Sequence, residues 1–139
     1  MKRILTLSFL PISRDMALLL LRLVIGLSLF VKHGIEKLTG FSGMQQHFPD
    51  TLHVGVTFGL TYATLTDGIC SLLVILGLAS RLSAFLIVFN LLVVFIFLHH
   101  FSFMDGHAEL VWAYTGGFLA ILISGPGKYS LDNRFFGTK

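Results

Sequence analysis

Four apolar stretches, each long enough to cross a lipid bilayer, constrain the fold of this chain more than any other feature. A membrane-spanning helix needs about 17–25 mostly apolar residues, because it rises about 1.5 Å per residue through hydrocarbon about 30 Å thick. The stretches run from about Met16 to Lys32, Val54 to Leu78, Leu82 to His100 and Ala108 to Ser124. They predict an all-α, polytopic membrane protein, an antiparallel bundle of four transmembrane helices with short loops, forming one domain over residues 1–139.

The composition agrees with a protein whose main partner is the lipid bilayer. Charged residues make up 12% of the chain, whereas roughly 25% is usual in soluble domains. The net charge of +3 is small and its basic residues are scattered, so we expect no nucleic-acid partner. A single cysteine, Cys70, excludes an intrachain disulfide and a CxxC redox motif.

The basic residues near the ends of the stretches predict the orientation. Those at the end that carries both termini are Lys2, Arg3, Arg14, Arg81, Lys128, Arg134 and Lys139. The opposite end holds Lys32 and Lys37. We therefore expect both termini in the cytoplasm, with the first residues forming an uncleaved cytoplasmic segment.

One cation, Arg22, interrupts the apolar sequence LLLLRLVIGL of residues 18–27. A charge at mid-bilayer costs about 2.5–3.5 kcal/mol on insertion scales, so it usually faces the bundle interior and has a partner. Asp67 is the only acid in the middle of any stretch, and the helical rise places it at a depth that overlaps that of Arg22. We predict a buried ion pair between Arg22 and Asp67, which acts either as a lock between helices or as a ligand or proton site.

A second group of titratable residues gathers at the other end of the stretches. Its main members, which we name the outer polar cluster, are His33, Lys37, His99 and Glu109. An imidazole beside a carboxylate can bind and protonate a quinone head while an apolar bundle holds the tail. The alternative is that these residues cap and orient helices at the membrane interface.

Other cofactors fit this cluster less well. Imidazoles and carboxylates also bind zinc, copper or iron, and two histidines can hold a haem. No short HxxxH spacing lies on one stretch, however. We therefore expect no metal and no haem, keep quinone as the candidate cofactor, and assign no catalytic residue.

The C-terminal sequence GPGKYSLD (125–132) has a physical interpretation of its own. Gly125, Pro126 and Gly127 should end the fourth helix, because proline and glycine continue a helix poorly. Asp132 should then bond Arg81 or Arg14 across the inner helix ends.

The motifs together resemble the DoxX family over almost the whole chain. RLVIGLSLFVKHGIEKLTGF (22–41) is similar to the opening motif of that family, and DGICSLLVILGLASRLSAF (67–85) is similar to its second motif. GHAELVWAY (106–114) resembles the entry to its fourth helix, and the 125–132 sequence its ending. The individual matching positions include Arg22, His33, Gly34, Lys37, Arg81, His99 and Glu109. Position 67 departs, because relatives usually carry glutamate where this chain has Asp67.

The resemblance implies a multi-pass protein of the bacterial inner (cytoplasmic) membrane that works with redox systems. Family members include subunits of thiosulfate:quinone oxidoreductase, and others form complexes with superoxide dismutase and sulfurtransferase. We therefore expect an accessory or quinone-contacting subunit of a redox complex, with a soluble or membrane redox partner or a second copy of the chain. Whether it is itself an enzyme stays open. A non-catalytic scaffold that recruits a partner is the alternative, and a small-solute or proton transporter is a third, for which four helices are few.

Overall fold

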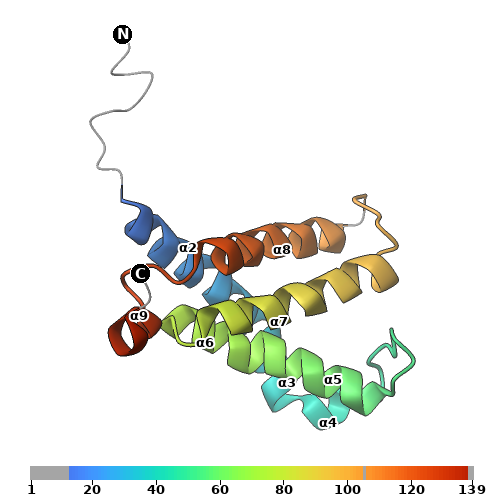
Figure 1. The fold of residues 1–139 in the computed structure, drawn as a ribbon. Helices are drawn as coiled ribbons and strands as arrows, with labels where there is room; N and C mark the ends of the chain where they lie inside the picture. Colours follow the sequence, from blue (N-terminus) through green and yellow to red (C-terminus); the bar gives the residue numbers. More distant parts are fainter. Residues whose placement is uncertain (1–12, 105, 138–139) are drawn as a thin grey trace.

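The computed structural model describes residues 13–104 and 106–137, which form a bundle of long helices (Figure 1). Within this part of the chain, four helices are long and apolar enough to cross a membrane. They are Arg14–Thr39, Val56–Leu76, Ser80–Leu98 and Gly106–Ser124. The predicted all-α, four-helix membrane fold is therefore confirmed. The first twelve residues, predicted to form a cytoplasmic segment, lie outside the described part.

The first membrane helix is longer than its hydropathy predicts. It consists of α2 (Arg14–Leu29), a π-helical segment η1 (Phe30–Gly34) and α3 (Ile35–Thr39). Ser13 caps its start, where Oγ accepts a hydrogen bond from the backbone N–H of Met16 at 3.2 Å. The predicted end at Lys32 was too early, because the polar residues that follow continue the helix instead of leaving it.

The other elements follow in chain order. They are α4 (Phe41–Met44), α5 (Val56–Thr64), η2 (Leu65–Cys70), α6 (Ser71–Leu76), α7 (Ser80–Val93), η3 (Val94–Leu98), α8 (Gly106–Ser124) and α9 (Leu131–Phe136). Three of the four membrane helices thus contain a π-helical segment, a feature that is often found at functional sites. His33 lies in η1, Asp67 lies in η2, and His99 directly follows η3.

An apolar stripe along the first helix faces outward and the bundle core lies on its other side. The exposed residues of the stripe are Leu20, Val24, Leu27, Val31, Ile35 and Leu38. Their spacing of three and four residues places them on one helical face, which suits contact with lipid. The core between the helices includes Leu29, Val74, Ile87, Phe118 and Ile121, each at most 1% exposed.

Two glycines set the register between the first and second membrane helices. A Cβ at Gly26 would lie 2.7 Å from Cγ1 of Ile75, and a Cβ at Gly34 would collide with the carbonyl oxygen of Asp67. Small residues of this kind let helix backbones approach closely inside a membrane. The middle of the second helix therefore lies beside Gly34, near the far end of the first helix.

The chain reverses after α8 and returns over the ends of the other helices. α8 ends at Ser124, where the Gly-Pro-Gly sequence predicts its end, and Gly125 and Gly127 have φ values of 82° and 76°. This left-handed conformation favours glycine. The short helix α9 then packs at the same end of the bundle as the start of α2 (Figure 1).

Candidate functional site

The buried carboxylate at the centre of the bundle pairs with a lysine. Asp67 Oδ2 lies 2.9 Å from Nζ of Lys37, and the two side chains are only 8% and 11% exposed. The predicted ion pair between Arg22 and Asp67 is therefore wrong. Both cations belong to the first helix, but the close approach at Gly34 places Lys37, one turn further along, beside the acid.

Two neighbours complete the hydrogen bonding of this carboxylate. Asn90 on α7 donates from Nδ2 to Oδ1 of Asp67 at 3.3 Å, and the single proton of the Thr66 hydroxyl is shared between the same oxygen at 3.2 Å and the carbonyl oxygen of Ala63 at 3.1 Å. Asn90 was not among the predicted site residues. The sequence did indicate a role for Asn90, because an amide in the middle of an apolar membrane stretch must find a hydrogen-bond partner. The network therefore joins the first three membrane helices.

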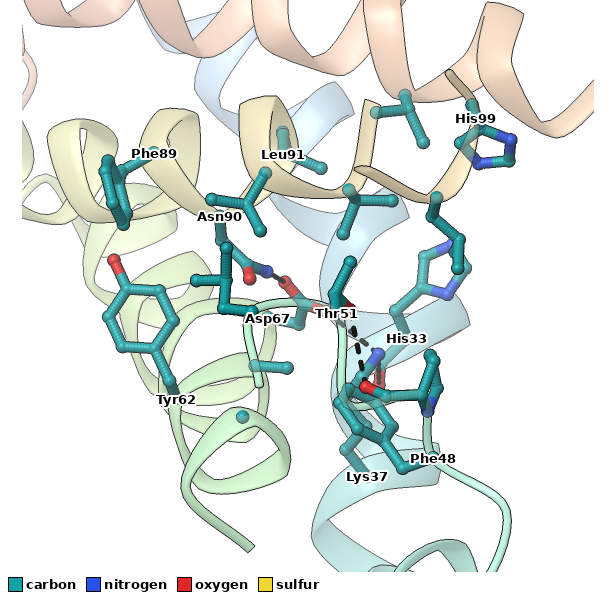
Figure 2. A pocket seen from close by; sticks show the side chains of 18 of the residues that line it. His33, Lys37, Phe48, Thr51, Tyr62, Asp67, Phe89, Asn90, Leu91 and His99 are labelled. Carbon is teal, nitrogen blue, oxygen red and sulfur yellow. Dashed lines mark hydrogen bonds and ion pairs between the residues drawn. The ribbon is translucent and has the colours of Figure 1, made fainter. Parts of the chain in front are cut away.

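A cavity of about 400 Å³ adjoins this network and reaches toward the end of the bundle opposite α9. Figure 2 shows Lys37, Asp67 and Asn90 at its polar side, with Tyr62, Phe89 and Leu91 around it. The loop between α4 and α5 covers the cavity with residues 48–52 and Val54. Asp50 holds that loop, because its carboxylate accepts hydrogen bonds from the N–H groups of Val54 and Gly55 at 3.1–3.2 Å.

The structure brings together three of the four residues of the outer polar cluster. His33, Lys37 and His99 all line the cavity, together with His107 and Tyr114. The Tyr114 hydroxyl donates to Oγ of Ser28 at 2.9 Å. Glu109 departs from the prediction, because it is exposed in the first turn of α8 and is not part of the cavity wall.

This arrangement suits a ligand with a polar head and an apolar body. The Lys37 ammonium has three N–H donors, of which one is used by Asp67 and a weaker one, at 3.5 Å, by the carbonyl oxygen of His33. Within the described residues the third has no acceptor, so a ligand could supply one. The remaining wall is mostly aliphatic and aromatic, as in Leu29, Phe58 and Val94.

Arg22 lies at the other end of the bundle, under the C-terminal segment. Its side chain is 1% exposed, and Nη2 donates to the carbonyl oxygen of Tyr129. A Cβ at Gly77 would collide with Nη1, so the guanidinium packs against the turn between α6 and α7. Among the described residues, Nε and Nη1 have no hydrogen-bond partner.

The predicted bonds of Asp132 to Arg81 or Arg14 are also wrong. The two carboxylate oxygens of Asp132 instead accept hydrogen bonds from the backbone N–H groups of Ala79 and Ser80, at 2.7 and 2.8 Å. These N–H groups begin α7 and have no partner inside the helix. Arg81 donates to the carbonyl oxygen of Ile123 at 3.3 Å. The tail therefore caps a helix instead of forming a surface ion pair.

Comparisons with known proteins agree with the membrane fold. Residues 17–100 match the family profile described as DoxX. The chain is 34% identical to Inner membrane protein YqjF of Escherichia coli (strain K12) over 124 residues. This alignment covers 85% of this chain and 91% of that protein. The chain is 29% identical over 130 residues to Inner membrane protein YphA of the same organism, covering 88% and 92% of the two chains. No solved structure matches at a significant level. With four membrane-spanning helices, the chain is a multi-pass protein of the bacterial inner membrane.

Proposed function

The chain belongs to the DoxX family, and from the geometry of its cavity we propose that it is an accessory, quinone-contacting subunit of a bacterial membrane redox complex. The observation that carries this proposal is a mostly apolar cavity with the Lys37–Asp67 ion pair at its buried side. Its volume of about 400 Å³ falls within the roughly 300–1,000 Å³ that is usual for small-molecule sites.

The residues of the cavity fit the two parts of a quinone. Lys37 has an N–H donor for a carbonyl oxygen of the head, and Asp67 holds that lysine in place. The apolar wall, which includes Phe58, Phe89 and Leu98, suits the ring and the first part of the tail. A bound quinone would supply two-electron chemistry, for which a partner subunit delivers the electrons.

His33 is the group best placed to exchange protons with a ligand in the cavity. It lies in the π-helical segment η1 on the cavity wall, and its own carbonyl oxygen accepts a hydrogen bond from Lys37. An imidazole can donate or accept a proton near neutral pH, as protonation of a reduced quinone requires. We assign His33 this role, and we assign Lys37 and Asp67 to binding and orienting the head.

The direct test measures quinone binding in the purified protein. The wild type should carry quinone in its lipid extract and should bind a short-chain ubiquinone or menaquinone analogue in detergent. The double variant Lys37→Gln with Asp67→Asn removes both charges while keeping similar shapes, so a buried charge is not left unpaired. Loss of one charge-assisted hydrogen bond should weaken binding by about 10–100-fold.

A matched control comes from the same helix. Lys32 and Glu36 are exposed and do not line the cavity, so Lys32→Gln with Glu36→Gln likewise removes one charge of each sign, but outside the cavity wall. Its affinity should equal that of the wild type. A wild-type protein that neither retains nor binds quinone would overturn the proposal. If that protein still copurifies with a stable partner, the scaffold function would replace it.

A further inference from the structure

A second cavity lies at the opposite end of the bundle, where the chain after α8 folds back over the helix ends. It has a volume of about 750 Å³. We call it the tail pocket, and the wall residues that matter here are Arg14, Leu18, Ser80, Arg81, Leu82 and Lys128. None of these belongs to the cavity that the proposed function uses.

Three cations from three different segments converge on the tail pocket. Arg14 begins α2, Arg81 lies in the first turn of α7, and Lys128 lies in the returning tail. The pocket wall also holds two carboxylates, but both are engaged by backbone donors. Those of Asp132 bind the start of α7, and Oδ1 of Asp15 accepts from the N–H of Lys128 at 2.8 Å. The two carboxylates keep their negative charges, so three positive against two negative side chains leave the pocket wall with a net charge of +1.

A buried hydroxyl supports a ligand at this site independently of the charges. Ser80 lines the tail pocket and is 0% exposed, yet its Oγ has no hydrogen-bond partner within the described residues. A buried hydroxyl without a partner is unfavourable. An acceptor oxygen in the pocket would satisfy it.

We propose that the tail pocket binds a phosphate group, held by Arg14, Arg81 and Lys128 and accepting a hydrogen bond from Ser80. Basic side chains and hydroxyl donors at the ends of membrane helices suit the phosphate of an anionic lipid headgroup. Two apolar residues in the pocket wall, Leu18 and Leu82, favour a lipid as the source of the phosphate, because they can contact acyl chains. Leu82 is 62% exposed on the outer face of α7. Free phosphate has the same binding chemistry, and the experiment distinguishes the two sources.

The test uses the full-length protein, stripped of lipid in detergent and reconstituted in nanodiscs. One set contains phosphatidylcholine alone, and the other contains phosphatidylcholine with phosphatidylglycerol. Native mass spectrometry counts retained lipids, and thermal unfolding reports Tm. A third arm titrates inorganic phosphate into the phosphatidylcholine sample. We expect the wild type to retain phosphatidylglycerol selectively and to gain Tm with it.

The variant for this test is Arg14→Gln with Lys128→Gln, which keeps the backbone N–H of residue 128 for Asp15 and leaves Arg81 in place. Its affinity for phosphatidylglycerol should fall by about 30-fold, the loss expected for two basic side chains near a phosphate. The control is Lys32→Gln with Arg134→Gln, which removes two exposed charges that do not line the pocket. The control should bind like the wild type.

A second variant, Ser80→Ala, removes only the unpartnered hydroxyl and should weaken lipid retention without lowering the Tm of the lipid-free protein. If phosphate alone raises Tm in the wild type and not in the double variant, the site is real and its source is free phosphate. Equal lipid retention in the double variant and the control, with no phosphate effect, would overturn the proposal. Quinone binding at the other cavity does not depend on either result.

Discussion

Lys37 and Asp67 join the first and second membrane helices through an ion pair of 2.9 Å that is almost completely removed from solvent. Asn90 ties the third helix to the same carboxylate. Removing one charge of such a pair affects the free energy of unfolding differently from removing both charges. Removing one leaves a buried charge unpaired, whereas removing both leaves two neutral polar groups.

We therefore expect Asp67→Ala to lower the free energy of unfolding by about 3–5 kcal/mol, because it strands the Lys37 ammonium. The Lys37→Gln with Asp67→Asn variant should recover most of this loss. The measurement is unfolding in mixed detergent micelles, with exposed Glu36→Gln on α3 as the control. Equal stability of Asp67→Ala and the control would contradict the buried pair.

Gly34→Ala tests the close approach that brings Lys37 to Asp67. The added Cβ would collide with the carbonyl oxygen of Asp67, and overpacking of this kind costs about 1–3 kcal/mol. Gly116→Ala on α8 is the matched control, because a Cβ there meets no atom within 4 Å. It should be neutral or slightly stabilising, since alanine favours a helix over glycine. A Gly34→Ala protein as stable as Gly116→Ala would show that the helices are further apart.

Asp132→Ala should release the C-terminal segment from the start of α7. The two backbone N–H groups of Ala79 and Ser80 lose their acceptors, and loss of a helix cap costs about 0.5–2 kcal/mol. Trypsin should then cut faster after Lys128 and Arg134 in the loosened tail. Glu109→Ala removes an exposed acid on α8 and should leave the cutting rate unchanged. An unchanged rate in Asp132→Ala would argue against the cap.

Cys70 offers a measurement of bundle opening that needs no added probe site. It is 3% exposed in the core and is the single cysteine of the chain. N-ethylmaleimide should label it only when the bundle unfolds, and Asp67→Ala should speed the reaction. The comparison is Ser42→Cys in a Cys70→Ala background, since Ser42 is exposed on α4. If native Cys70 is labelled as fast as the thiol of that comparison variant, the core is open.

Hydropathy alone predicted the four membrane helices because each must bury its backbone polar groups in hydrocarbon over a minimum length. The sequence also singled out four residues that line the cavity, since His33, Lys37, Asp67 and His99 are polar groups in or beside apolar stretches. The end of α8 was also predicted from local sequence, because Gly125, Pro126 and Gly127 interrupt the helix through the conformation of their own backbone. These features depend on neighbours in sequence and on the solvent, so one sequence is enough to predict them.

The choice of partners depended on contacts between segments far apart in the chain. Arg22 and Lys37 share the spacing of one helical face, so the sequence offers Asp67 two cations. The approaches of Gly26 to Ile75 and Gly34 to Asp67 set the register. In that register Arg22 lies twelve residues before Gly34, about 18 Å along the helix, and beside Gly77 instead.

The π-helical segments and the returning tail also determined the partners of Lys37 and Arg22. An extra residue per turn in η1 rotates Lys37 relative to Arg22, which a uniform helical period does not predict. The buried Arg22 then donates a hydrogen bond to the carbonyl oxygen of Tyr129. Any residue at that position could supply this backbone acceptor, so no side-chain pattern in the sequence indicates it. Local chemistry therefore determined which residues had to be buried in this protein, and tertiary packing alone decided which of them meet.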